Sequence, residues 1–151
     1  TATFFDYGYF AKTTDGKVIP TRDFSGIENL KAVTYAYKYN VHYWNEAVKP
    51  AGIYNVPIQI VPEVNPLTLR RGDTLQLRIY KDGAPYANAP VIADVLGDLT
   101  NETQADANGY VSVRIANNGL NVIGVEVGFP TDNPIVTKKI FSSLSFIIPA
   151  E

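Results

Sequence analysis

The sequence of 151 residues contains no cysteine, no methionine, one histidine and one tryptophan. Without cysteine the chain forms no disulfide and offers neither a thiol nucleophile nor a thiolate metal ligand. With one imidazole, it supplies at most one histidine to a metal site or to a catalytic base. Because no methionine is present, we expect Thr1 to be an interior position left by processing or truncation. We therefore expect a segment upstream of Thr1.

Strong charge of either sign is also missing. There are 13 basic and 15 acidic residues, the net charge is −2, and no basic run exceeds two residues. We expect no nucleic-acid partner and no attraction to an anionic membrane, since both need a dense positive surface. No apolar stretch approaches the roughly 20 residues that span a bilayer as a helix. The chain is therefore predicted to contain no transmembrane segment.

The common motifs of catalysis are absent. No glycine-rich phosphate loop, zinc-ligand spacing or nucleophile elbow occurs, and no pair of residues offers a nucleophile with a base. The segment Asp106–Gly109 resembles part of a calcium loop, but Ile115 stands where the bidentate glutamate is needed. We predict a hairpin turn there, and we do not expect an enzyme.

A tripeptide that binds integrins in other proteins occurs at Arg71-Gly72-Asp73. It lies between an extended segment, 61–69, and a strand that begins at Thr74. Gly and Asp favour turns for steric and hydrogen-bonding reasons. The tripeptide is therefore predicted to form a turn rather than a recognition site.

Ten tyrosines and a scarcity of helix-forming runs predict an all-β protein. Residues 1–56 are predicted to be a β-rich amino-terminal part, which we expect to be incomplete. Within it, Asp15-Gly16 favours a hairpin between strands 4–12 and 17–20. Thr3, Phe5, Tyr7 and Tyr9 are expected on one face of the first strand. A further strand follows over 36–44.

After a linker at 49–57, the pattern changes to short strands with turns at regular spacing. Six or seven strands over about 95 residues are typical of an immunoglobulin-like β-sandwich, predicted here for residues 57–151. A β-rich appendage thus precedes the sandwich. The predicted strands are 58–61, 74–80, 89–95, 110–116, 120–127 and 137–148.

Two candidate sites follow from the strand over 36–44. His42 is a candidate metal ligand, with an exposed or interface histidine as the alternative. Tyr37, Tyr39, Tyr43 and Trp44 are candidates for a ligand or partner surface, together with Phe4, Phe5, Tyr7, Tyr9 and Phe10 of the first strand, because aromatic rings stack on sugars and cover protein partners. The alternative is a hydrophobic seam between appendage and sandwich.

The runs PIQIVPEVNPLTLRRGDTLQLRIYKDGAPYANAPVIAD and TQADANGYVSVRIANNGLNVIGVEV resemble a family of bacterial extracytoplasmic proteins that carry a domain of unknown function. The family is linked to nickel or cobalt uptake. The resemblance implies a prealbumin-type, carboxypeptidase-regulatory-like sandwich, a periplasmic or secreted location, a nickel or cobalt ion, and a membrane transport component as partner. The family's histidine motif has no counterpart in this chain.

These observations lead to two hypotheses. The first is a non-catalytic extracytoplasmic binding module, accessory to nickel, cobalt or other solute uptake, that contacts a protein or a small ligand. The second is a structural adhesion or carbohydrate-binding sandwich that uses surface aromatics. The first requires His42 beside oxygen ligands if metal is bound. The carbohydrate hypothesis requires at least two coplanar exposed rings, and a protein-binding surface requires a broad apolar patch.

Overall fold

The computed structural model describes residues 1–53 and 55–150, and within them it contains strands and one short 3-10 helix but no α-helix. The expected all-β class is confirmed. The elements are β1 (Ala2–Thr13), β2 (Val18–Thr21), β3 (Leu30–Tyr43), β4 (Ile58–Pro62), η1 (Pro66–Thr68), β5 (Thr74–Lys81), β6 (Ala84–Pro85), β7 (Pro90–Asp94), β8 (Asp98–Gln104), β9 (Tyr110–Arg114), β10 (Gly119–Pro130) and β11 (Val136–Ile148).

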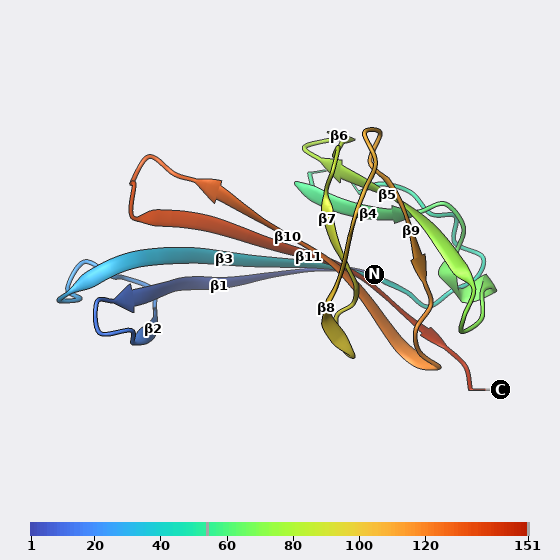
Figure 1. The fold of residues 1–151 in the computed structure, drawn as a ribbon, viewed down its shortest axis with the longest axis horizontal. Coiled ribbons are helices and arrows are strands. Elements are labelled where there is room, and N and C mark those ends of the chain that lie inside the picture. Colours follow the sequence, from blue (N-terminus) through green and yellow to red (C-terminus); the bar gives the residue numbers. More distant parts are fainter. Residues whose placement is uncertain (54, 151) are drawn as a thin grey trace.

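The strands form two sheets of unequal size. The large sheet has the order β2-β1-β3-β11-β10-β7-β8, and the small sheet joins β4, β5, β6 and β9. The small sheet covers only part of the large one, giving the expected sandwich, while β1, β2, β3 and the β10–β11 turn project beyond it (Figure 1). We call the projecting part, residues 5–13, 18–38 and 128–138, the extension. The face of the large sheet toward the small sheet is its inner face.

The large sheet contains strands from both predicted parts of the chain. β3 pairs in parallel with β11, in register from Val33 opposite Val136 to Tyr43 opposite Phe146. Residues 49–53 and 55–57 contain no strand, as expected for the linker; Tyr54 lies outside the described residues. The boundary between an amino-terminal part, 1–56, and a sandwich, 57–151, remains a prediction.

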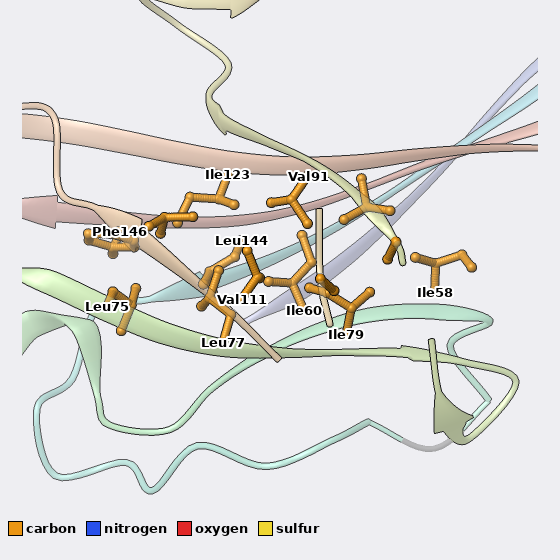
Figure 2. Packing of buried hydrophobic residues seen from close by; sticks show 14 of the residues in the cluster. Ile58, Ile60, Leu75, Leu77, Ile79, Val91, Val111, Ile123, Leu144 and Phe146 are labelled. Atoms are coloured by element: carbon orange, nitrogen blue, oxygen red, sulfur yellow. The ribbon is translucent and has the colours of Figure 1, made fainter. Parts of the chain in front are cut away.

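The core lies between the two sheets and follows the predicted alternation. Leu75, Leu77 and Ile79 of β5 are fully buried, whereas the residues between them face outward. Phe146 and Leu144 of β11 meet them from the large sheet (Figure 2). Burying a side chain of this size stabilises the fold by about 1.5–3 kcal/mol. The sandwich is therefore the part of the molecule in which apolar burial is concentrated.

The turns predicted at Arg71-Gly72-Asp73 and Asp106–Gly109 are present, but the second joins strands of different sheets instead of the two strands of a hairpin. Arg71-Gly72-Asp73 is a turn, in which the Asp73 carboxylate accepts from Arg70 N and Arg71 Nε donates to a backbone carbonyl. Asp106–Gly109 is also a turn, yet it leads from β8 in the large sheet to β9 in the small sheet. The expected hairpin at this turn was wrong, because the polar strand β8 had not been predicted.

Candidate binding surface

A bulge in β1 decides which aromatic side chains share a face. Asp6 lies opposite Tyr37 and Gly8 lies opposite Ala36, so Tyr7 is an extra residue without a counterpart in β3. Gly8 adopts φ +74, and its N–H donates to the Asp6 carboxylate at 2.8 Å. An inserted residue reverses the alternation beyond it. The expected grouping of Tyr9 with Tyr7 was therefore wrong.

Because of the bulge, β1 and β3 display one continuous row of rings. Directly opposite residues share a face, so Phe4 opposite Tyr39 and Tyr9 opposite Tyr35 lie on the inner face. We call the row the aromatic ladder. Its successive ring centroids are 4.5–5.7 Å apart in the order Phe24, Tyr9, Tyr35, Tyr37, Phe4 and Tyr39.

The ladder runs from the tip of the extension to the sandwich. Tyr37 and Tyr39 pack against the buried core, and burial raises the pKa of Tyr39. Phe4 is 51% exposed. On the β11 side, Lys138 Nζ lies 4.9 Å from the centroid of the Tyr37 ring. The small sheet thus covers the Tyr39 end of the ladder, whereas Tyr9, Phe24 and Tyr35 at the other, open end lie beyond the small sheet and are half-buried.

A charged network fixes the middle of the ladder. The Tyr35 hydroxyl donates to the Asp6 carboxylate at 2.7 Å, and Arg22 Nη1 lies 3.4 Å from the same group. The hydrogen bonds from Tyr35 and Gly8, followed by the Arg22 charge, lower the pKa of Asp6. The same hydrogen bond raises the pKa of Tyr35. Tyr35 is therefore a neutral hydrogen-bond donor at physiological pH.

The open end of the ladder borders a hollow of about 340 Å³. Tyr9, Phe24 and Tyr35 form its aromatic wall. The opposite wall comes from the β10–β11 turn, residues 131–133, together with Val136 and Lys138. Apolar rings beside a polar rim are the usual composition of a contact surface between proteins. Chemically, the hollow suits a side chain with an apolar body and a polar end.

Comparison with known proteins gives a family without an assigned activity. The model of a family described as "Domain of unknown function (DUF4198)" matches residues 1–128. The chain belongs to this DUF4198 family. No curated protein and no solved structure matches it. The resemblance seen in the sequence is thereby confirmed as far as a domain of unknown function. The match includes the strands β1 and β3 that carry the ladder.

In this DUF4198 chain, the four predicted surface residues lie in different settings. Tyr37 and Tyr39 belong to the ladder, where they also pack on the core. Tyr43 is 7% exposed and belongs to the core, where burial raises its pKa. Trp44 is 74% exposed beyond the end of β3. The hydrophobic seam considered as an alternative therefore describes the surroundings of Tyr43 and part of those of Tyr39.

His42 lies on the outer face near the end of β3, beside a hydroxyl. Its Nδ1 is 2.8 Å from Ser145 Oγ. Among residues 1–53 and 55–150, no group of three or more His, Cys, Asp or Glu side chains is arranged to hold a metal ion. One imidazole and one hydroxyl fall short of the ligand sets usual for nickel or cobalt. The residues at His42 do not complete such a site, and its role as a ligand remains a prediction.

Sequence reasoning missed two rings of the ladder. Tyr35 continues the alternation of Tyr37 and Tyr39 by one step toward the amino terminus, so the pattern itself could have included it. Phe24 lies in the loop after β2, and its ring reaches Tyr9 at a centroid distance of 5.0 Å. That contact depends on how the loop folds back, for which the sequence carries no periodic signal.

Over the described residues, no helix is long and apolar enough to cross a membrane.

Proposed function

We propose that this chain is a non-catalytic extracytoplasmic binding module that holds a protein partner through the aromatic ladder of the extension. The observation that carries the proposal is the row of six rings in contact with one another, of which the Tyr39 end is covered by the small sheet. Tyrosine and phenylalanine are enriched at the energetic centres of protein interfaces. Tyr9, Phe24, Tyr35 and Tyr37 are only half-buried, so a partner would remove further apolar surface from water.

Ring orientation favours a protein over a sugar as the occupant. The pair Tyr35–Tyr37 is near perpendicular at 89°, and Tyr9–Phe24 is at 72°. The most nearly parallel neighbours, Phe4 and Tyr37, are still tilted by 30°. A flat platform for consecutive sugar rings needs coplanar faces, whereas an irregular aromatic surface fits protein side chains. The carbohydrate-binding or adhesion hypothesis is therefore the second candidate.

We further propose that the module has an accessory role in the uptake of nickel, cobalt or another solute. In that role the partner would be a component of the transport machinery outside the cytoplasm. The donor set around His42 supplies no independent support for a metal bound by this chain. The proposed role therefore rests on protein contact, with metal binding by His42 as a separate and testable addition.

The proposal is tested with peptides selected from a random displayed library on the purified chain. The test variant replaces two rings of the open end, Tyr9→Ser with Tyr35→Ser, because neither ring packs on the buried core. The control is Tyr80→Ser with Tyr110→Ser, two half-buried tyrosines that stack on Arg78 in the small sheet. We expect the test variant to weaken peptide binding by about tenfold or more, since each such ring is worth 1–2 kcal/mol.

Each alternative receives its own titration. Ni²⁺ or Co²⁺ binding that disappears in His42→Ala would establish a metal site at this residue. Oligosaccharides that bind the chain and lose affinity in the ladder variant would favour the carbohydrate hypothesis. Peptides that bind the ladder variant and the control variant equally would contradict the proposed surface.

A further inference from the structure

One edge of the large sheet is open along the first half of β1. β2 pairs with β1 only over Tyr9–Lys12. His42 N donates to the Thr1 carbonyl at 2.8 Å, which places Thr1 in a hydrogen-bonded pair with β3. Because such pairs alternate in an antiparallel ladder, the N–H and C=O groups of Ala2 and Phe4 point away from β3. They have no backbone partner within the described residues.

The open segment of this edge lacks the charges and prolines that keep many strand edges from pairing. The edge strand at the opposite side of the sheet, β8, carries Asp98 and Glu102, and like charges oppose its pairing with a copy of itself. The segment Ala2–Phe5 has no charge and no proline. Phe4 and Phe5 are each 51% exposed, on opposite faces. An uncharged apolar edge of this kind is a template for another extended chain.

Arg22 limits the open edge and selects how a second strand can align. Its Nη2 donates to the Asp6 carbonyl at 3.3 Å, so this outward carbonyl is already bonded. Two copies of β1 related by a two-fold axis at Thr3 would pair Ala2 with Phe4 and Phe4 with Ala2. Centring the axis on Phe4 instead would require the Asp6 carbonyl. Of these two alignments, the axis at Thr3 is the one that leaves the Arg22 contact intact.

The surface beside Ala2 fits a large side chain in this alignment. A cavity of about 250 Å³ is lined by Ala2, Val41, Val48 and Ile53, together with Trp44 and other residues of the segment after β3. Side chains directly opposite across a strand pair have Cβ atoms about 4.5–5.5 Å apart. Phe4 of a second copy would thus lie next to the small Ala2 side chain and beside this cavity.

We infer that two copies of this chain associate by antiparallel pairing of their β1 edges, with Thr3 on the two-fold axis. The interface is isologous, because each copy gives the same segment to the other. The axis is perpendicular to the joined sheet, so both aromatic ladders lie on the same side of it. Two ladders on one surface would bind a bivalent partner more tightly than one.

The absence of cysteine makes the alignment directly measurable. Thr3→Cys places one thiol at the axis, where Cα atoms of a non-hydrogen-bonded pair are about 4.5 Å apart and suit a disulfide. Phe5→Cys is the control, on the same face of the strand. Its two copies would lie about 13 Å apart along the strands. Under mild oxidation we expect a covalent dimer from Thr3→Cys and monomer from Phe5→Cys.

Sedimentation equilibrium tests the hydrogen bonds of the edge. Ala2→Pro removes an N–H that points away from β3, so the fold is retained while edge pairing is lost. Ala2→Ser keeps that N–H and is the matched control. We expect Ala2→Pro to raise the dimer dissociation constant by about tenfold or more and Ala2→Ser to leave it nearly unchanged. The ladder variant Tyr9→Ser with Tyr35→Ser should still dimerise.

The outcomes separate this inference from the proposed function. A dimer that is retained in the ladder variant while peptide binding is lost supports both. A wild-type chain that stays monomeric, with Thr3→Cys linking no faster than Phe5→Cys, overturns the inference and leaves the ladder proposal standing. A dimer that tolerates Ala2→Pro places the contact elsewhere and also overturns it. A chain that stays monomeric but binds an extended peptide along β1 would also overturn the inference, because the edge would then pair with a strand of another protein.

Discussion

The sandwich and the extension are built from the same sheet, yet they bury their side chains differently. In the sandwich the inner face meets the small sheet, and Leu144 and Phe146 are completely buried. In the extension the inner face meets solvent over part of its length, and its tyrosines contact one another. The comparison indicates a division of labour, in which the sandwich supplies stability and the extension presents a surface.

The extension also contains a network of polar contacts around one charged side chain, Asp6. Asp6 receives hydrogen bonds from Gly8 and Tyr35 and an ion pair from Arg22. Such contacts fix orientation more than they add free energy, because exposed ion pairs contribute little. A half-buried aromatic row with its middle held by hydrogen bonds is the arrangement expected of a preformed contact surface.

The largest expected effect comes from removing residues 1–56. The deletion takes Tyr43 out of the core and leaves β11 unpaired along Val136–Phe146. We expect residues 57–151 alone to lose cooperative thermal unfolding, measured by circular dichroism, because β11 loses its partner strand and the core loses Tyr43. The uncovered edge of β11 also favours aggregation. A sharp transition like that of the full chain would instead establish the second part as an independent domain.

A single core substitution should have the next largest effect. Phe146→Ala removes a fully buried ring between the sheets and should lower the free energy of unfolding by about 3–5 kcal/mol. Urea denaturation measures the change. Phe5→Ala, a substitution at an exposed ring of the extension, is the control and should cost well under half as much. Equal costs at the two positions would contradict the difference in burial between the regions.

The smallest expected effect is the response of the extension to pH. The pKa of Asp6 lies below its ordinary value of 3.8, so the folded state binds fewer protons than the unfolded state as the pH falls past that value. The contribution of Asp6 is therefore fully present above about pH 4 and is lost as the pH falls through its folded pKa. The Gly8 amide resonance should report this loss in the wild type.

Two variants sharpen the pH experiment. Asp6→Asn removes the titrating group, so the Gly8 resonance should no longer respond in that range. Asp132→Asn, on the far wall of the hollow, should leave the response unchanged. An unaltered response in Asp6→Asn would show that another group holds the extension.

Periodicity explains why the strands could be predicted and why parts of the surface could not. The alternation of Leu75, Leu77 and Ile79 identifies a half-buried strand, and the same rule indicates Tyr37 and Tyr39. Beyond Tyr7 the side chains of β1 change face because of a bulge, which a simple two-residue alternation does not predict. β8 carries the segment DLTNETQ, whose polar residues match no strand pattern. The contact of Phe24 with Tyr9 arises only when the chain folds.

The most direct test of the division of labour measures stability and binding on one variant. Tyr9→Ser with Tyr35→Ser is examined for its free energy of unfolding in urea and for its affinity toward the selected peptides. The account predicts an affinity loss of about tenfold or more, with a loss of stability smaller than that of Phe146→Ala. A variant that loses stability as Phe146→Ala does, and binds in proportion to its folded fraction, would contradict a binding role for the ladder.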